Sequence, residues 1–407
     1  MSSETPFRIA ISDSELSFLQ QKLALTRLPD ELDDAGWDYG VPLADMQRLL
    51  ARWQDGYDWR KYERELNELL QFTRDIEVTG FGKLNIHYLH QRSAVEEAIP
   101  LLFVHGWPGS FFEARKVFPL LTAASAEYPS FHVVVLGLPG YGFSEGVKQK
   151  GFKMVQYAEV GHKLMLALGY SEYVAQGGDW GHLVTRQMAA TYGPKHVKAW
   201  HTNMPISMPP KPHRNPVLFL ELILHSLTPF SPYTESERKG LERAQWFSSK
   251  GQGYSKEQGT QPQTLGYSLA DSPVGLLAWI YEKLVNWTDN YQWEDDEVLT
   301  WVSIYWFSRA GPASSLRIYY EIMNDSLMSL PYVRGVPLGV SYYPKEVAPT
   351  PRSWTKAFIG EVVFESEHAS GGHFAAYEEP EAFVADLRKM FGKGGPSFGV
   401  VPGLTGY

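Results

Sequence analysis

The stretch Gly177-Gly-Asp-Trp-Gly181 decides the fold that this sequence predicts. It follows residues 173–176, an apolar run typical of a buried strand, and precedes residues 182–190, which have a helical pattern. Glycines on both sides of a central residue permit the strained strand–turn–helix that raises one side chain above a sheet. Serine is the usual central residue, and here it is Asp179. The stretch therefore predicts a carboxylate nucleophile, the alternative being a helix N-cap.

Short apolar runs alternate with helical patterns on both sides of this turn. Residues 76–78 and 84–89 predict a hairpin. Continuous apolar runs or strand signals occur at 100–104, 131–136, 173–176, 197–200, 336–341 and 357–364. Such alternation predicts a mostly parallel central sheet with helices on both faces.

Two segments depart from this pattern and divide the chain into four parts. Residues 1–75 predict an N-terminal helical arm that packs on the core, opening with a capping box at Ser12 and Glu15. Residues 204–330 lose the alternation and predict a mainly helical lid. The sheet domain is then split into a first part, 76–203, and a second part, 331–407.

Composition excludes several classes of function. The chain of 407 residues has no cysteine, which removes disulfides, thiolate nucleophiles and cysteine-ligated metals. A net charge of -9 argues against a nucleic-acid partner. The polar start and the lack of an apolar run of about 20 residues predict a soluble, cytoplasmic protein without a membrane anchor. An aromatic fraction of 14%, with many of the tryptophans in the lid, predicts an apolar pocket.

Two further motifs supply groups that an aspartate nucleophile needs. His105-Gly-Trp-Pro-Gly109 directly follows a strand, where a turn can point backbone N–H groups into a cleft. The N–H groups of Trp107 and Trp180 are therefore the predicted oxyanion hole. Gly371-Gly-His-Phe374 places His373 on a late loop as the candidate base. Its acid partner is predicted to be Glu346, with Asp325, Glu365 and Glu367 as weaker competitors.

The order nucleophile, acid, base (179, 346, 373) is that of the α/β-hydrolase fold. An aspartate nucleophile displaces a group from sp³ carbon to give an ester, which activated water then hydrolyses. Epoxide opening and haloalkane dehalogenation both suit this chemistry, and a lid tyrosine would favour the first by protonating the oxygen. Two more distant alternatives remain open, a non-catalytic binding module and a serine esterase using Ser144 in Gly142-Phe-Ser-Glu-Gly146.

Taken together, the motifs resemble the microsomal-type epoxide hydrolases of the α/β-hydrolase superfamily, including soluble fungal members. The resemblance implies that Asp179 is the nucleophile, Glu346 the relay acid and His373 the base, and that no cofactor or metal is used. It assigns the two lid tyrosines to Tyr319 and Tyr254, with Tyr267 as the reserve for the second. The further pocket candidates are His105, Pro108 and Trp306.

The implied reaction adds water to a small apolar epoxide to give a vicinal diol. The native substrate and its stereochemistry are not determined by these motifs. The sequence also does not separate a role in detoxification or aromatic hydrocarbon catabolism from a biosynthetic one, and it leaves the oligomeric state open, a homodimer included.

Overall fold

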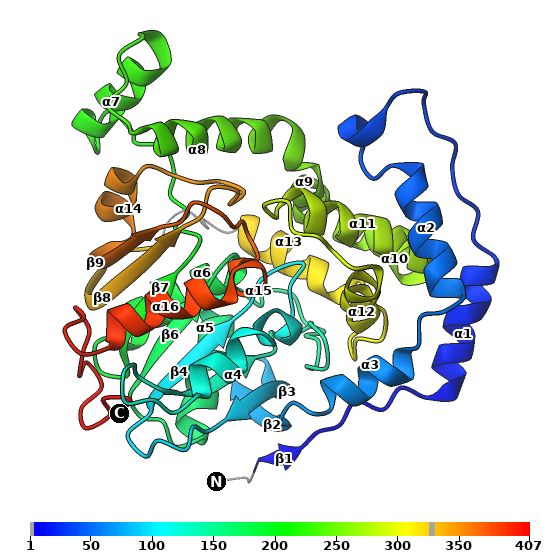
Figure 1. Ribbon diagram of the computed structural model, residues 1–407, viewed down its shortest axis with the longest axis horizontal. Coiled ribbons are helices and arrows are strands. Elements are labelled where there is room, and N and C mark those ends of the chain that lie inside the picture. Colours follow the sequence, from blue (N-terminus) through cyan, green and yellow to red (C-terminus); the bar gives the residue numbers. More distant parts are fainter. Residues whose placement is uncertain (1–3, 325–329) are drawn as a thin grey trace.

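The computed structural model describes residues 4–324 and 330–407, and its centre is a twisted β-sheet (Figure 1). In the described part of the chain the strand order is β1-β2-β3-β5-β4-β6-β7-β8-β9. The strands are β1 (Thr5–Pro6), β2 (Gln71–Val78), β3 (Gly82–Gln91), β4 (Ile99–Val104), β5 (Phe131–Leu136), β6 (Tyr173–Gly177), β7 (Val197–Thr202), β8 (Val333–Tyr342) and β9 (Gly360–Glu367). From β5 to β9 all neighbours pair in parallel, whereas β1, β2 and β3 are antiparallel. The predicted mostly parallel sheet is confirmed.

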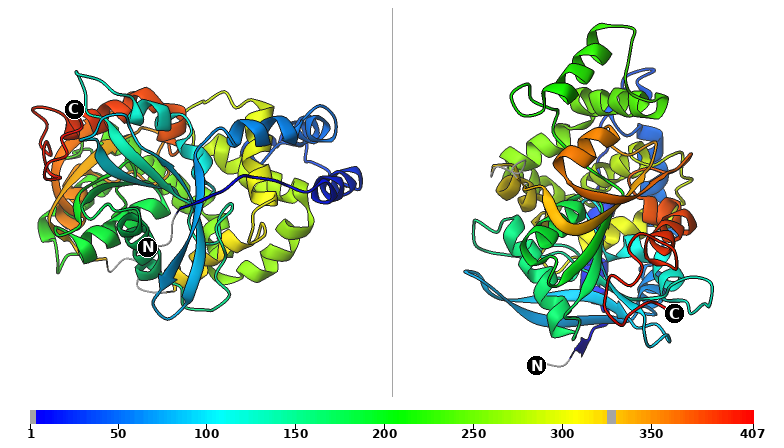
Figure 2. Two further views of the ribbon diagram at one scale, coloured as in Figure 1. Left: turned by 90° about the horizontal axis from the view of Figure 1, so that it is seen from below. Right: turned by 90° about the vertical axis from the view of Figure 1, so that its left-hand side faces the viewer.

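Helices cover both faces of this sheet, as the two perpendicular views show (Figures 1 and 2). Helices α5 (Met154–Ala167) and α6 (Trp180–Tyr192) pack together on one face. On the other, α16 (Pro380–Phe391) packs against α4 (Val117–Thr122). Shorter elements η2 (Phe111–Ala114), α14 (Arg352–Phe358) and α15 (Ala375–Glu378) complete the core domain. The strands between them are almost completely buried, which explains their continuous apolar runs.

Two strand boundaries differ from the prediction. The last strand begins at Gly360, because residues 357 and 358 end helix α14. Strand β2 begins at Gln71, inside the predicted helical arm, and β1 also lies in that segment. The buried positions of β2 include Gln71, which is hydrogen bonded to His87, and Arg74, which donates to the carbonyl of Ala167. Polar residues at buried positions hide the alternation that marks a strand.

The segment between β7 and β8 consists of helices and loops. Its elements are α7 (Pro216–Leu227), α8 (Glu235–Trp246), η3 (Phe247–Gly251), α9 (Gly253–Thr260), α10 (Pro262–Asp271), α11 (Pro273–Asn286), α12 (Asp295–Trp306), η4 (Ser314–Leu316) and α13 (Arg317–Met323). Helices α7 and α8 stand at the top of Figure 1, away from the cluster of α9 to α13. Within the described ranges, no helix combines the length and the apolar character needed to cross a membrane.

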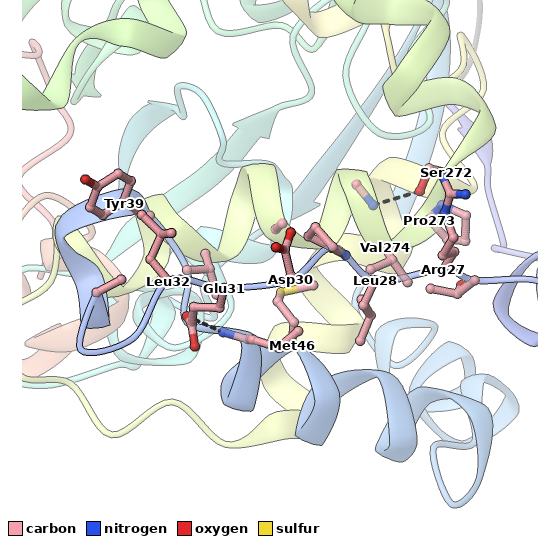
Figure 3. A pocket seen from close by; sticks show the side chains of 18 of the residues that line it. Arg27, Leu28, Asp30, Glu31, Leu32, Tyr39, Met46, Ser272, Pro273 and Val274 are labelled. Atoms are coloured by element: carbon pink, nitrogen blue, oxygen red, sulfur yellow. Dashed lines mark hydrogen bonds between the residues drawn. The ribbon is translucent and has the colours of Figure 1, made fainter.

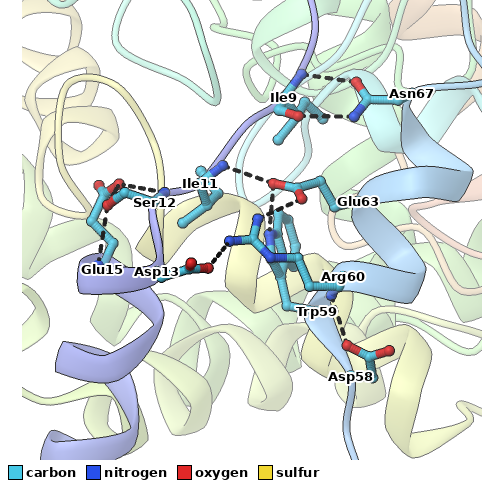
Figure 4. Close-up of polar contacts among 10 residues, drawn as sticks. All are labelled: Ile9, Ile11, Ser12, Asp13, Glu15, Asp58, Trp59, Arg60, Glu63 and Asn67. Atoms are coloured by element: carbon cyan, nitrogen blue, oxygen red, sulfur yellow. Dashed lines mark hydrogen bonds and ion pairs between the residues drawn. The ribbon is translucent and has the colours of Figure 1, made fainter.

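The N-terminal segment packs mainly against this lid, with α1 (Asp13–Ala24), η1 (Gly36–Tyr39), α2 (Leu43–Gln54) and α3 (Trp59–Leu66) beside α11 and α12 (Figure 1). Arg52 donates two hydrogen bonds to Asp296 of α12. Figure 4 shows how the segment is held to itself: the Glu63 carboxylate accepts from the N–H of Ile11 and from the indole of Trp59. The predicted capping box of Ser12 and Glu15 is confirmed in the same view.

Candidate active site

Asp179 occupies a sharp turn between β6 and α6. Its φ of 52° lies in the left-handed region, a strained conformation for a residue with a Cβ atom. The flanking glycines are required sterically, because a Cβ on Gly177 would lie 2.2 Å from the carbonyl oxygen of Gly181 and one on Gly181 would lie 1.9 Å from that of Val104. Although Asp179 stands at the N-cap position of α6, its side chain makes no capping hydrogen bond. The side chain is therefore directed away from helix capping.

Two backbone N–H groups bind the Asp179 carboxylate. The N–H of Trp107 donates to Oδ1 over 2.8 Å, and the N–H of Trp180 also acts on this carboxylate. Burial raises the pKa of Asp179, while His373 and these two donors oppose the rise. The two N–H groups that the sequence suggests as oxyanion donors thus both act on the Asp179 carboxylate. Donors in this position can stabilise negative charge on the same oxygen during ester hydrolysis.

His373 and Glu346 complete the cluster from two loops on the same edge of the sheet. His373 Nε2 lies 3.5 Å from Asp179 Oδ2, and His373 Nδ1 lies 2.6 Å from Glu346 Oε1. The loops themselves are joined by a bridge between Lys345 and Gly372. Burial lowers the pKa of His373, but Glu346 and Asp179 outweigh it and raise the pKa to about 9. The imidazole is therefore oriented by Glu346 and aimed at Asp179.

The competing residues are engaged elsewhere. Glu365 pairs with Lys356 and accepts from Tyr342, and Glu367 pairs with Arg352. Asp325 lies outside the described residues. Ser144, the alternative nucleophile, is fully buried; it donates to the carbonyl of Gly137 and accepts from the N–H of His87. These backbone contacts give Ser144 a structural role and no hydrogen bond to a base.

Both candidate tyrosines line one cavity with Asp179. The cavity measures about 580 Å³, and Tyr254 of α9 and Tyr319 of α13 reach it from the lid. Both are buried, and burial together with the charge of Asp179 raises their pKa values far above the ordinary range. The reserve candidate Tyr267 is 70% exposed on α10 and does not line the cavity. The structure therefore brings Tyr254, and not Tyr267, to the site.

Aromatic rings surround the reacting groups. The Trp107 ring stacks on Tyr254 at 5.1 Å and meets the edge of Tyr319 at 5.7 Å. Trp287 of the lid packs on His373 at 4.9 Å, and its carbonyl accepts the His373 N–H. The sequence provides no periodic signal that would single out Trp287 among the lid tryptophans. Its contacts with Tyr254 and His373 make it a link between lid and base.

The other pocket predictions are corrected by the structure, since His105, Pro108 and Trp306 do not line this cavity. The His105 ring is buried against Tyr141 and accepts from the N–H of Leu138, and burial lowers its pKa to about 4. The Pro108 carbonyl accepts the indole N–H of Trp301. Trp306 faces the N-terminal segment and stacks on Phe18. All three residues have structural contacts, which their sequence positions did not reveal.

Two buried charged residues near the site were not predicted from the sequence. Glu113 follows the Trp107 turn, and burial raises its pKa to about 8. Arg186 of α6 lines the same cavity as Asp179.

A second cavity of about 760 Å³ lies between the N-terminal segment and the lid, where Arg27, Leu28 and Val274 line it (Figure 3). That cavity contains none of the predicted catalytic residues.

Two protein families match this chain. The family described as "Epoxide hydrolase N terminus" matches residues 4–114, and the "alpha/beta hydrolase fold" family matches residues 99–228. Epoxide hydrolase 1 of Sus scrofa is 36% identical over 413 residues, which cover 95% of this chain and 88% of the relative.

Solved structures extend the likeness to the whole fold. The epoxide hydrolase of Aspergillus niger is 34% identical, covers 95% of both chains and superposes with a TM-score of 0.82. The juvenile hormone epoxide hydrolase of the silkworm Bombyx mori is 30% identical, covers 95% of this chain and 93% of that one, and has a TM-score of 0.84. On this evidence the chain belongs to the epoxide hydrolase family of α/β-hydrolase enzymes.

Proposed function

We propose that this enzyme opens epoxides through a covalent ester on Asp179 and releases vicinal diols. The observation that carries the proposal is the cluster of Asp179, His373 and Glu346 beside a cavity that Tyr254 and Tyr319 also line. An epoxide bound there meets a carboxylate on one side and two phenolic hydroxyls on the other. Water is the second substrate.

In the first step, the Asp179 Oδ2 atom attacks one epoxide carbon. A new C–O ester bond forms, and the bond between that carbon and the epoxide oxygen breaks. Tyr254 or Tyr319 donates a proton to the leaving oxygen, which becomes the first hydroxyl group. A correctly placed general acid is worth roughly 10²–10⁴ in rate. The raised pKa values of both tyrosines keep them protonated and able to donate before the reaction.

In the second step, His373 Nε2 removes a proton from water, and the water oxygen attacks Asp179 Cγ. Negative charge develops on Oδ1, which accepts from the N–H of Trp107, and the N–H of Trp180 also acts on this carboxylate. Collapse of this intermediate breaks the bond between Cγ and the ester oxygen. That oxygen takes the remaining proton of the water and leaves as the second hydroxyl group, which restores the Asp179 carboxylate. His373 gives its original proton to the tyrosinate after the ester forms and then keeps the proton that it takes from water, so the enzyme ends in its starting state.

The electrostatics suit this sequence of steps. In the free enzyme, Glu346 and Asp179 raise the pKa of His373 to about 9, so the imidazole is protonated at neutral pH. Ester formation removes the negative charge of Asp179 and with it one of the causes of the raised pKa. The imidazole then gives its proton more readily to the tyrosinate, at the stage when a neutral base is needed.

A single turnover in H₂¹⁸O with excess enzyme and styrene oxide tests the ester. We expect the ¹⁸O label in the Asp179 carboxylate and unlabelled diol, because water attacks Cγ and the diol oxygen comes from the enzyme. Label found directly in the diol would refute the covalent route. The Asp179→Ala variant should form no diol, while Ser144→Ala, a change at the competing serine, should still form ester at Asp179.

A further inference from the structure

The cavity that contains the nucleophile also has a cluster of cations. Arg186, Lys211 and Arg214 line it, and the only carboxylate in its lining, among the described residues, is Asp179. This balance is opposite to that of the whole chain, whose net charge is -9. Because local charges dominate the field inside a cleft, a substrate entering here meets a positive surface away from the reacting carboxylate.

Arg186 is the innermost of the three cations and is 7% exposed. Its Nη2 atom donates to the carbonyl groups of Leu330, Pro331 and Phe358. Its Nε atom is buried with no hydrogen-bond partner. In the part of the chain that the structure describes, Arg186 forms no ion pair. Burial lowers its pKa to about 10, so the guanidinium stays charged at neutral pH, with no counter-ion among the described residues. Buried guanidinium groups are normally paired with an anion.

Lys211 and Arg214 lie at the mouth of the same cavity, in the connection between β7 and α7. The N–H of Arg214 donates to the Lys211 carbonyl, so a turn holds the two residues together. Both residues are exposed, and within residues 4–324 and 330–407 neither side chain forms an ion pair. The Ser207 hydroxyl in the cavity wall likewise has no hydrogen-bond partner. Several hydrogen-bond donors at this end of the cavity thus have no acceptor among the described residues.

Helix α6 sets the distance between the two ends. Arg186 lies almost two helical turns beyond the start of α6 at Trp180, so its backbone is roughly 10 Å along the helix axis from the turn that carries Asp179. Leu183 lies between them and also lines the cavity, which leaves an apolar wall from carboxylate to guanidinium. An extended chain advances about 1.2 Å per bond, so the gap corresponds to roughly eight bonds.

From this arrangement we infer that the enzyme prefers amphipathic epoxides whose aliphatic chain ends in an anionic group, a carboxylate about eight bonds from the epoxide. The inference deepens the proposed function and rests on it. Arg186 binds the anionic group inside the cavity, while Lys211 and Arg214 attract it to the mouth. Asp179 attacks at the other end, beyond the apolar wall formed by Leu183.

The test compares an ω-epoxy alkanoate of this length with its methyl ester, which has the same chain and no charge. A hydrogen bond between charged groups favours the carboxylate by about 10- to 100-fold in kcat/KM over the ester. We expect this preference to appear mainly in KM and to fall as ionic strength rises, since salt screens the mouth. Equal kcat/KM for the two substrates, or a preference for the ester, would overturn the inference.

Variants assign the preference to these residues. The double change Lys211→Ala/Arg214→Ala should lower kcat/KM for the carboxylate by about tenfold and leave the ester within about twofold. The control Lys148→Ala/Lys150→Ala removes the same charge from exposed positions outside the cavity and should alter neither substrate. An equal loss for both substrates in the mouth variant would contradict the inference.

Arg186→Met should remove most of the remaining preference, and Arg186→Lys should restore part of it. Because Arg186 also holds three carbonyl groups, the mouth variant alone decides the question if Arg186→Met does not fold. Styrene oxide separates this inference from the proposed function. Turnover of styrene oxide and of the ester without a carboxylate preference refutes only the inference, whereas no turnover of either substrate refutes both.

Discussion

Glu113 is a carboxyl group that the fold keeps out of water beside the active site. It lies on η2, directly after the Trp107 turn, and its Oε2 atom packs so closely on Gly109 that a Cβ there would be 2.3 Å away. Burial raises its pKa from 4.5 to about 8; the charge of His373 opposes the rise and those of Asp179 and Glu346 add to it. At neutral pH the native protein therefore holds a proton that the unfolded chain has released.

The substitution Glu113→Gln removes this proton and keeps the shape of the side chain. Between the ordinary pKa of glutamate and about 8, the native state of the wild type binds more protons than the unfolded state, so rising pH favours unfolding. One pKa unit corresponds to about 1.4 kcal/mol, so the wild type loses on the order of 4 kcal/mol relative to the variant between pH 5 and pH 8. Above the folded pKa the difference is constant.

Urea unfolding of both proteins at pH 5 and pH 8 measures this difference. We expect the free energy of unfolding of Glu113→Gln, relative to wild type, to rise by about 4 kcal/mol over this interval. The control Glu235→Gln alters an exposed carboxylate whose pKa is lowered by Lys239, so its effect should be the same at both pH values. Parallel stabilities of wild type and Glu113→Gln across the interval would refute the argument, because they would mean that Glu113 ionises normally in the folded protein.

Three further predictions concern the site and the N-terminal segment. His373→Gln should form the Asp179 ester but hydrolyse it at least about 10²-fold more slowly, so mass spectrometry should detect one equivalent of adduct; turnover without adduct would contradict the role of the base. Tyr254→Phe and Tyr319→Phe should each slow ester formation by about 10²-fold in stopped-flow experiments, whereas Tyr267→Phe should not, and equal rates in all three would exclude the tyrosines as acids. Glu63→Ala should cost about 3 kcal/mol in urea unfolding, because it leaves two buried donors unpaired, yet should not change kcat; an unchanged unfolding midpoint would show that these bonds contribute nothing.

Much of the fold was predictable because local chemistry constrains it. Positions 177 and 181 of the turn cannot accept a residue larger than glycine, since a Cβ atom at either would collide with backbone, so these glycines identify the strand–turn–helix directly. The parallel strands can be recognised in the sequence as continuous apolar runs, because both of their faces are buried. The order of Asp179, Glu346 and His373 then follows from the topology, which brings the ends of three parallel strands to one edge.

The walls of the cavity were less predictable, because they depend on which distant elements meet. His105 and Pro108 lie in the same turn as Trp107. The His105 ring nevertheless accepts a hydrogen bond from the N–H of Leu138, and the Pro108 carbonyl accepts one from the indole of Trp301. Trp287 and Trp306 are both lid tryptophans, and only the packing of the lid places Trp287 against His373 and Trp306 against Phe18. The wall of the cavity includes Leu183 of α6. A helical pattern in the sequence does not distinguish such a residue from one that packs in the core.

Buried charges explain why composition alone does not describe the electrostatics of the cavity. The net charge of a chain is the sum over all its charged side chains, most of which are exposed. Water and salt screen those exposed charges, so they do not act inside a cavity. Arg186 stays charged with no counter-ion among the described residues, whereas burial keeps Glu113 neutral beside the site, so the net charge of the chain does not give the charge around the cavity. With Glu113 protonated, the negative charge at the reacting end comes from Asp179 and Glu346 facing His373, while the far end stays positive. An acidic chain with abundant aromatic residues can therefore have a binding cavity suited to an anionic tail.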